Sequence, residues 1–176
     1  MLIDYLLSII LGILSSLVAS IVFLLLLSTL RPNIEISESI AQGKDALDAS
    51  MYSIKVINRG RRSVMNVKAQ LQLIEPTNAP NGTIEEASDI PLEGTDPLEL
   101  AAFSRKDDTE GYACRFSTLE DMDKCWADDK HAYLRFRIFA TDSLSGLGRV
   151  FTQKYRLKRI ALRNGSFVKG HELTIV

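Results

Sequence analysis

The sequence predicts a mainly β protein, with one β-sandwich that follows a single amino-terminal membrane-spanning helix. Residues 6–30 form a run of 25 residues without a charge. A helix of that length is roughly 37 Å long, which is enough to cross a hydrocarbon core of about 30 Å. The rest of the chain alternates apolar and polar residues in short segments between turns, which is typical of a β-sandwich. We therefore expect a membrane anchor over residues 1–31 and one β domain over residues 32–176.

The amino-terminal segment is predicted to be an uncleaved anchor. A signal peptide starts with basic residues and has an apolar core of about 7–15 residues, whereas this chain starts with an acidic segment and has a longer apolar run. Pro32 ends the helix, because proline cannot continue it. Arg31 follows the apolar run and no basic residue precedes it. The positive-inside rule then favours a single-pass inner-membrane protein with a cytoplasmic carboxyl-terminal domain.

Small residues recur every four positions in the anchor, at Ser8, Gly12, Ser16 and Ser20. On a helix they form one stripe, and small stripes allow the close backbone approach that favours helix association in lipid. The alternative is that the hydroxyl groups bond back to their own helix. We expect a homo-oligomer, with this stripe as the contact between helices.

The first half of the domain predicts three strands. Residues 33–37 alternate, and residues 51–58 alternate again with Tyr52, Ile54 and Val56 on one face. A turn over residues 58–62 leads to a strand over residues 64–74, and these two longer strands are expected to pair as a hairpin. The later strand sorts its residues into an apolar face and a polar face, namely Val67, Ala69, Leu71 and Leu73 against Lys68, Gln70 and Gln72.

The connections and the second half complete the prediction. Residues 41–48 are expected to be a polar loop, and residues 75–96, acidic and proline-rich, a long surface excursion with a turn at Asn81-Gly82. Ser117 and Glu120 predict a capping box that starts a short helix to about Trp126. The strands expected after residue 97 are 98–103, 112–116, 132–142, 149–157, 167–168 and 173–176. In the strand over 132–142, Leu134, Phe136 and Ile138 oppose Arg135 and Arg137.

Two stretches, residues 54–71 and residues 139–168 with their Ala-Thr-Asp-Ser turn, carry a resemblance to a known family. In strand and turn pattern they resemble the cytoplasmic domain of inward-rectifier potassium channels, over most of residues 53–169. The resemblance implies an immunoglobulin-like β-sandwich, assembly into an oligomer and ligand-dependent coupling to a membrane segment. The chain has no pore helix and no Thr-x-Gly-Tyr-Gly filter, so potassium selectivity does not follow from the resemblance.

The sequence contains no pattern that predicts catalysis, a metal site or a cofactor. His131 and His171 are the two histidines and lie far apart, and Cys114 and Cys125 lack the spacing of a zinc site. No nucleophile elbow, phosphate loop or dinucleotide fingerprint is present. We therefore predict that the protein is not an enzyme. The two cysteines are free thiols in a cytoplasmic domain, or a disulfide if the domain is extracytoplasmic, and this alternative stays open.

Basic residues provide the candidate binding site. Residues 31–110 carry a net charge of −5 and residues 111–176 a net charge of +5. Lys154, Arg156 and Lys158 alternate on one predicted strand face, and a second cluster is the turn with Arg59, Arg61 and Arg62. Such clusters bind phosphate groups or an anionic membrane surface, although charge runs are more often solvated faces.

These observations favour a sensor or effector domain that binds a ligand and is coupled to an oligomeric anchor in a lipid bilayer. The expected ligand is an anionic small molecule or nucleotide, and a second-messenger-gated membrane effector of bacterial defence has this plan. No feature indicates binding of duplex nucleic acid. The alternative is a membrane-tethered immunoglobulin-like module that binds a protein partner without ligand gating.

Overall fold

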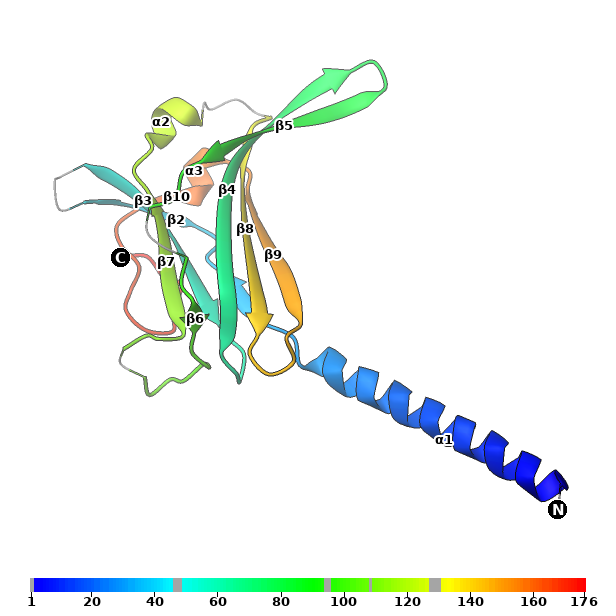
Figure 1. Cartoon of the computed structure of the whole chain (residues 1–176). Helices are drawn as coiled ribbons and strands as arrows, with labels where there is room; N and C mark the ends of the chain where they lie inside the picture. Colours follow the sequence, from blue (N-terminus) through cyan, green and yellow to red (C-terminus); the bar gives the residue numbers. More distant parts are fainter. Residues whose placement is uncertain (1, 46–48, 94–95, 108, 127–130) are drawn as a thin grey trace.

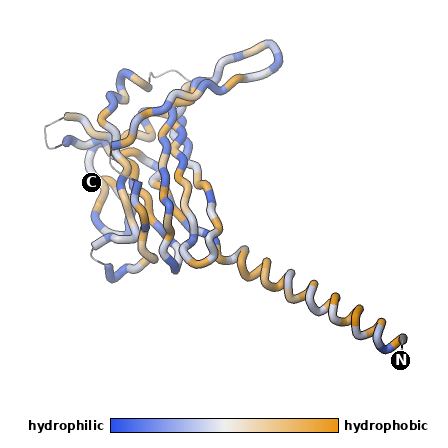
Figure 2. The backbone as a smooth tube through the Cα atoms, in the orientation of Figure 1, coloured by the Kyte–Doolittle hydropathy of each residue, from blue (hydrophilic) through white to orange (hydrophobic). Residues whose placement is uncertain are grey.

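The computed structural model describes residues 2–176 except 46–48, 94–95, 108 and 127–130. Helix α1, Leu2–Thr29, extends away from the β domain (Figure 1). Its segment Ile3–Leu27 is long and apolar enough to cross a membrane, and none of it is buried inside the protein. Figure 2 shows the apolar residues along the whole length of this helix. The apolar side chains of this segment are thus not packed against the β domain.

The remaining chain forms two five-stranded sheets that face each other, which confirms the predicted mainly β sandwich. Sheet A has the order β1-β3-β2-β10, with β7 also paired to β3. Its strands are β1 (Ile34–Ile36), β2 (Ile40–Lys44), β3 (Ser50–Asn58), β7 (Ala113–Thr118) and β10 (Leu162–Asn164). Sheet B has the order β5-β4-β8-β9, with β6 also paired to β4. Its strands are β4 (Val64–Ala79), β5 (Gly82–Ile90), β6 (Glu99–Leu100), β8 (Tyr133–Asp142) and β9 (Gly148–Tyr155). Two short helices, α2 (Met122–Cys125) and α3 (Lys158–Ala161), cover one end.

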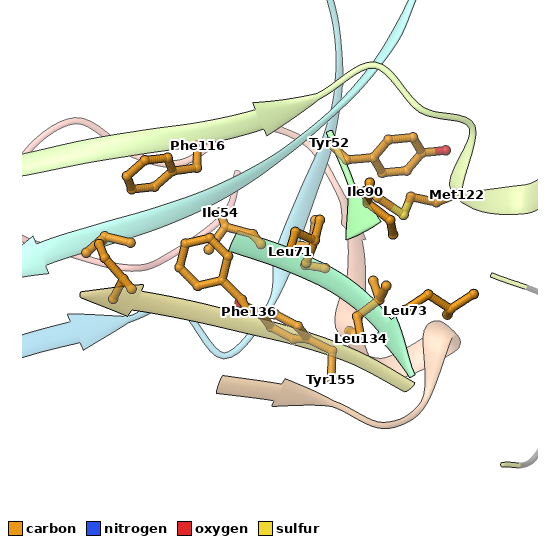
Figure 3. Packing of buried hydrophobic residues seen from close by; sticks show 14 of the residues in the cluster. Tyr52, Ile54, Leu71, Leu73, Ile90, Phe116, Met122, Leu134, Phe136 and Tyr155 are labelled. Carbon is orange, nitrogen blue, oxygen red and sulfur yellow. The ribbon is translucent and has the colours of Figure 1, made fainter. Parts of the chain in front are cut away.

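The apolar faces predicted from alternation form the core between the sheets (Figure 3). Ile54 and Val56 come from sheet A, whereas Leu71 and Leu134 come from sheet B, and each is at most 2% exposed. Phe116 and Phe136 meet across the core with their ring centroids 5.7 Å apart. Burial of these side chains is the main stabilising contribution to the sandwich, at about 1.5–3 kcal/mol for each large one.

The predicted hairpin of residues 51–58 and 64–74 is wrong, because β3 lies in sheet A and β4 in sheet B. The turn between them crosses from one sheet to the other. Asn58 holds this crossing with its side chain, which accepts a hydrogen bond from Gly60 N–H and donates to the carbonyl of Arg62. Both strands bury one apolar face, and alternation by itself does not distinguish two paired strands from two strands that face each other across a core.

The surface excursion predicted over 75–96 is indeed exposed along β5, but its first part is a β-ribbon and not a loop. Strand β4 continues to Ala79 and pairs with β5 in register from Leu71↔Ile90 to Ala79↔Gly82. The predicted turn at Asn81-Gly82 is confirmed as the tip of this hairpin, where Gly82 has a φ of 137°. Eight of the nine β5 residues are exposed. Backbone pairing therefore forms this strand without a buried face, and its sequence lacks the usual alternation.

Shorter predicted elements differ at their ends. The capping box is wrong, because residue 117 lies in β7 and α2 begins after Asp121, whose side chain accepts from the N–H of Asp123. The loop over 41–48 begins as strand β2, and the strand over 98–103 is only two residues long. The strands at 167–168 and 173–176 reduce to one bridge between Phe167 and Ile175. Strand β10, which the sequence did not predict, pairs parallel to β2.

The carboxyl-terminal segment after β10 packs on the outer face of sheet A. Lys55 of β3 is fully buried there. Its Nζ donates to the carbonyls of Val168 and Gly170 at 2.7 Å each and lies 3.3 Å from Glu110 Oε1. Glu110 also accepts from Gly170 N–H and pairs with Arg115. The outer face of sheet A is thus covered at Lys55, whereas several polar side chains on the outer face of sheet B remain exposed.

Candidate functional site

The two predicted basic clusters lie at opposite ends of the sandwich. Arg59, Arg61 and Arg62 belong to the β3–β4 connection, next to the end where Val64 pairs with Asp142. Lys154 is beside Tyr155, which pairs with Leu134 at the other end of β8. About nine residues of strand separate the two ends, which corresponds to roughly 30 Å. The structure therefore does not bring these clusters together into one site.

The first cluster is largely structural. Arg59 pairs with the Glu35 carboxylate, donates to the carbonyl of His171 at 2.9 Å and lies over the Phe103 ring at 5.0 Å. Arg62 pairs with Asp142 at 3.0 Å. Arg61 is exposed. Two of the three charges thus bind the loops of this end to one another.

The second cluster does not share one strand face, which corrects the prediction. Strand β9 ends at Tyr155, and Lys158 lies in α3, where it donates to the Trp126 carbonyl and pairs with Asp123 at 2.7 Å. Lys154 lies over the Tyr133 ring at 5.1 Å. Lys154 and Arg156 line a shallow hollow of about 240 Å³. The other residues of this hollow are Glu38, Tyr155, Leu157, Ile160 and Ala161.

A more organised group of polar residues lies on the outer face of sheet B. The register aligns side chains in rows across adjacent strands, because residues that pair directly point to the same face. The first row joins β5, β4, β8 and β9, and the next two join β4, β8 and β9. These rows are Asp89–Gln72–Arg135–Lys154, Gln70–Arg137–Thr152 and Lys68–Phe139–Val150.

A hydrogen-bond relay orients Arg137 in this face. Asp89 Oδ1 accepts from the side-chain amides of Gln70 at 2.9 Å and Gln72 at 2.8 Å. Both amide oxygens consequently point to β8, where Arg137 donates to each of them at 2.9 Å. Among the described residues, Arg137 has these neutral amides and no carboxylate as hydrogen-bond acceptors. The guanidinium is therefore held in place while its positive charge is not paired directly.

Arg135 occupies the neighbouring row and differs in its charge balance. Its guanidinium donates to Gln72 Oε1 at 3.1 Å and pairs with Glu85 of β5 at 3.2 Å. Its Nε is buried and has no hydrogen-bond partner among the described residues. A buried donor of this kind is rare, and it shows that the polar network of this face is incomplete within the described chain.

Beside Arg137 the surface forms a shallow hollow of about 320 Å³. Its lining residues are Lys68, Ala69, Gln70, Arg137, Phe139 and Val150. The Phe139 ring lies on Gly148, where an added Cβ would be 2.5 Å from ring atom Cε2. Glycine thus leaves the space that the ring occupies at this position. The hollow combines two cationic groups with an aromatic and aliphatic wall, which suits a ligand with an anionic group and a flat or apolar part.

The sequence contained the residues of this face but not their combination. Alternation placed Lys68 and Gln70 on one polar face and Arg137 on another. The pairing of β4 with β8 joins these two faces, and that pairing was not predicted. The signal that could have found the site is the presence of two long alternating strands whose polar faces hold Gln and Arg rather than mixed charges.

The described residues do not point to metal or thiol chemistry. They contain no group of three or more His, Cys, Asp or Glu side chains that could hold a metal ion. Cys114 and Cys125 are free thiols, so the alternative of a disulfide between them is wrong. Burial raises the pKa of Cys114 to about 12 and also raises the pKa of Cys125. Both thiols are therefore protonated and weakly nucleophilic at neutral pH.

Comparison of the chain with known protein families and with curated proteins found no match. The resemblance to the inward-rectifier cytoplasmic domain therefore stays a prediction from strand and turn patterns.

Proposed function

We propose that the protein is a membrane-anchored sensor or effector whose β-sandwich binds an anionic ligand on the outer face of sheet B. The supporting observation is the environment of Arg137. Two glutamine oxygens orient its guanidinium, which has no carboxylate partner among the described residues. Lys68 adds a second cation, and Phe139 adds an aromatic surface in the same hollow. A nucleotide combines a phosphate with a flat base, so a nucleotide second messenger fits this chemistry.

Strand β8 connects the proposed ligand site to the anchor. It carries Arg137 and Phe139 and ends at Asp142. Asp142 accepts from the N–H of Ser145 at 2.9 Å, and the Ser145 hydroxyl donates to the carbonyl of Leu30 at 2.6 Å. A ligand that shifts β8 would therefore act on the residue that directly follows α1. Coupling of this kind requires that the ligand favour one of two arrangements of the strand.

The remaining parts of the proposal concern the membrane. Helix α1 would cross the inner membrane with the β domain in the cytoplasm, in line with Arg31 after the apolar segment. Homo-oligomers would form through the stripe of Ser8, Gly12, Ser16 and Ser20. The hydroxyls of Ser8 and Ser20 donate to carbonyls four residues earlier, so the stripe would act through close packing more than through hydrogen bonds between helices. A nucleotide-gated effector of bacterial defence would combine these features.

Thermal unfolding of the full-length protein in nanodiscs tests the ligand site. A panel of linear and cyclic nucleotides is compared with inorganic phosphate and with uncharged nucleosides. A ligand at about 100 times its Kd stabilises the folded state by about 2.7 kcal/mol. We expect at least one anionic ligand to raise the Tm, Arg137→Gln to abolish the effect, and Arg156→Gln, at the other hollow, to retain it. The proposal is wrong if no anionic ligand raises the Tm, or if Arg137→Gln responds like the parent protein.

The second candidate, a protein-interaction module, rests on the β4–β5 hairpin. The hairpin projects beyond the sandwich at the end opposite α1 (Figure 1). Its strand β5 is exposed, including Ile84 at 57%. Exposed strand edges of this kind can pair with a partner chain. The test is a variant in which the ribbon is shortened by equal numbers of residues on both strands, with the tip from Ala79 to Gly82 kept. If the hairpin binds a protein, this variant should lose a partner that the parent protein recovers stoichiometrically in a pull-down. Any ligand-induced Tm shift should stay unchanged.

A further inference from the structure

The end of the sandwich next to α1 would lie very close to any bilayer that α1 crosses. Helix α1 ends at Thr29, and β1 begins at Ile34. The chain from Leu30 to Ile34 spans at most about 14 Å. One polar headgroup layer is about 5–8 Å thick, so this end of the domain cannot move far from the membrane surface once α1 crosses it.

The β8–β9 turn is held rigidly at this end. Asp142 Oδ1 accepts from the backbone N–H groups of Leu144 at 3.1 Å and Ser145 at 2.9 Å. The other carboxylate oxygen pairs with Arg62 at 3.0 Å. The Ser145 hydroxyl contacts the carbonyl of Leu30. The turn is thereby tied both to the β3–β4 connection and to the last residue of the apolar run.

This turn presents leucine side chains to the outside. Leu144 is 71% exposed and Leu147 is 37% exposed. Scattered exposed leucines are normal on a protein surface. Leu144, however, is the immediate neighbour of the residue that contacts the end of the anchor, and that position lies at the depth of the membrane interface if α1 spans the bilayer.

Basic residues surround the same end. Arg31, Arg61, Arg105 and Lys106 are exposed. The loop with Arg105 is joined to the turn with Arg61 by a hydrogen bond from Phe103 N–H to the Gly60 carbonyl. Two acids of this end are paired internally, Glu35 with Arg59 and Asp142 with Arg62, and Asp107 accepts from backbone N–H groups of its own loop. Glu99 stays exposed, but among the described residues of this end the exposed charge without an internal ion pair is mostly positive.

We propose that this end is a second membrane contact, distinct from the anchor. In this membrane-facing rim, Leu144 enters the interface and the basic residues Arg31, Arg61, Arg105 and Lys106 contact anionic lipid headgroups. Each basic residue near an anionic leaflet adds attraction, and an apolar side chain beside it adds burial. The rim would fix the β domain upright, with the β4–β5 hairpin directed away from the bilayer. The inference rests on α1 spanning a bilayer and does not depend on the ligand proposed for sheet B.

Site-specific fluorescence in nanodiscs tests the rim with the full chain. Cys114 and Cys125 are replaced by alanine, and the fold of this background is checked by circular dichroism. An environment-sensitive dye is then attached to Leu144→Cys or to Ile84→Cys, which is an exposed apolar position on the distal hairpin. Nitroxide-labelled lipids report contact with the bilayer, and aqueous iodide reports contact with water, in phosphatidylcholine discs with and without phosphatidylglycerol.

At position 144 we expect a blue-shifted emission, quenching by the nitroxide lipids and loss of iodide quenching, with position 84 quenched only by iodide. Phosphatidylglycerol should strengthen the lipid contact, and Arg61→Gln together with Lys106→Gln should remove that gain. The rim is refuted if position 144 behaves like position 84 in discs that contain the inserted protein, or if phosphatidylglycerol has no influence. Failure of the protein to float with lipid would refute the anchor itself, and the rim with it.

Discussion

Replacing Lys55 by methionine should release the carboxyl-terminal segment from sheet A and destabilise the domain. Lys55 is fully buried, and methionine fills a similar volume without the ammonium. The three contacts of Nζ are to one carboxylate and two carbonyls. Hydrogen bonds that involve a charged group contribute about 1.5–3 kcal/mol each, and an unsatisfied buried carbonyl costs about 1–3 kcal/mol.

The expected loss is smaller than the sum of these contributions. Burial lowers the pKa of Lys55, and the carboxylate of Glu110 only partly opposes this effect. Methionine therefore relieves part of the cost of burying an ammonium group. Glu110 retains Arg115 at 3.2 Å and the Gly170 N–H, so it is not left without partners. We expect a loss of about 3 kcal/mol, at the lower end of the roughly 3–5 kcal/mol seen when one partner of a buried ion pair is removed.

Urea unfolding of the full-length protein in detergent measures this loss. Trp126 is the single tryptophan and is 1% exposed, so its fluorescence reports unfolding of the β domain. Amide exchange should rise first in residues 166–176, because that segment loses its hydrogen bonds to Lys55. The double variant Lys55→Met/Glu110→Gln should lose less than the two single variants together, since contacting residues are coupled.

The pH dependence supplies an independent check. Burial raises the pKa of Glu110, but the Gly170 N–H, Arg115 and Lys55 outweigh this effect and hold it below the ordinary value of 4.5. The stability contributed by Glu110 is therefore complete above the ordinary value and is lost as the pH falls through the lowered value. In Lys55→Met this acid-side loss should be smaller. A loss of less than about 1 kcal/mol in Lys55→Met, which is usual for a surface change, would refute the proposed role of Lys55.

Three further predictions concern other parts of the domain. Gly148→Ala should cost about 1 kcal/mol, because its Cβ would displace the Phe139 ring, and it should weaken any ligand-induced Tm shift; an unchanged shift would exclude the ring from the site. Asp142→Asn should cost about 2 kcal/mol in urea unfolding, because it weakens charge-assisted bonds to the turn, and amide exchange at Ser145 should rise; unchanged exchange would contradict this. Cys114 should react with Ellman's reagent at pH 8 only after denaturant is added, because burial raises the pKa of this thiol to about 12; rapid reaction of the native protein would show that it is accessible.

The core residues could be predicted because a strand with one buried face has apolar residues at every second position. In β3, β4 and β8, the face that alternation predicts to be apolar is the buried face. Ile54, Leu71 and Phe136 are examples, one from each strand, and all three are buried. The outer part of the β4–β5 ribbon, residues 75–79 with 82–89, could not be predicted in this way, since neither strand has a buried face there. The burial of Lys55 could not be predicted either. Its position alternates with the core residues Ile54 and Val56, so its side chain would be expected to face solvent. Only the packing of the carboxyl-terminal segment on sheet A makes it interior.

The candidate site separates the two kinds of information most clearly. The sequence by itself determined that the chain has one long apolar helix, a β-rich domain and a polar face on each long strand. Only the tertiary structure decided that the polar faces of β4 and β8 are adjacent, that Arg59 and Arg62 pair internally, and that the two basic clusters lie at opposite ends. The physical reason is that alternation records which side of a strand meets water, whereas the choice of neighbouring strand depends on backbone pairing and on packing between residues far apart in the chain.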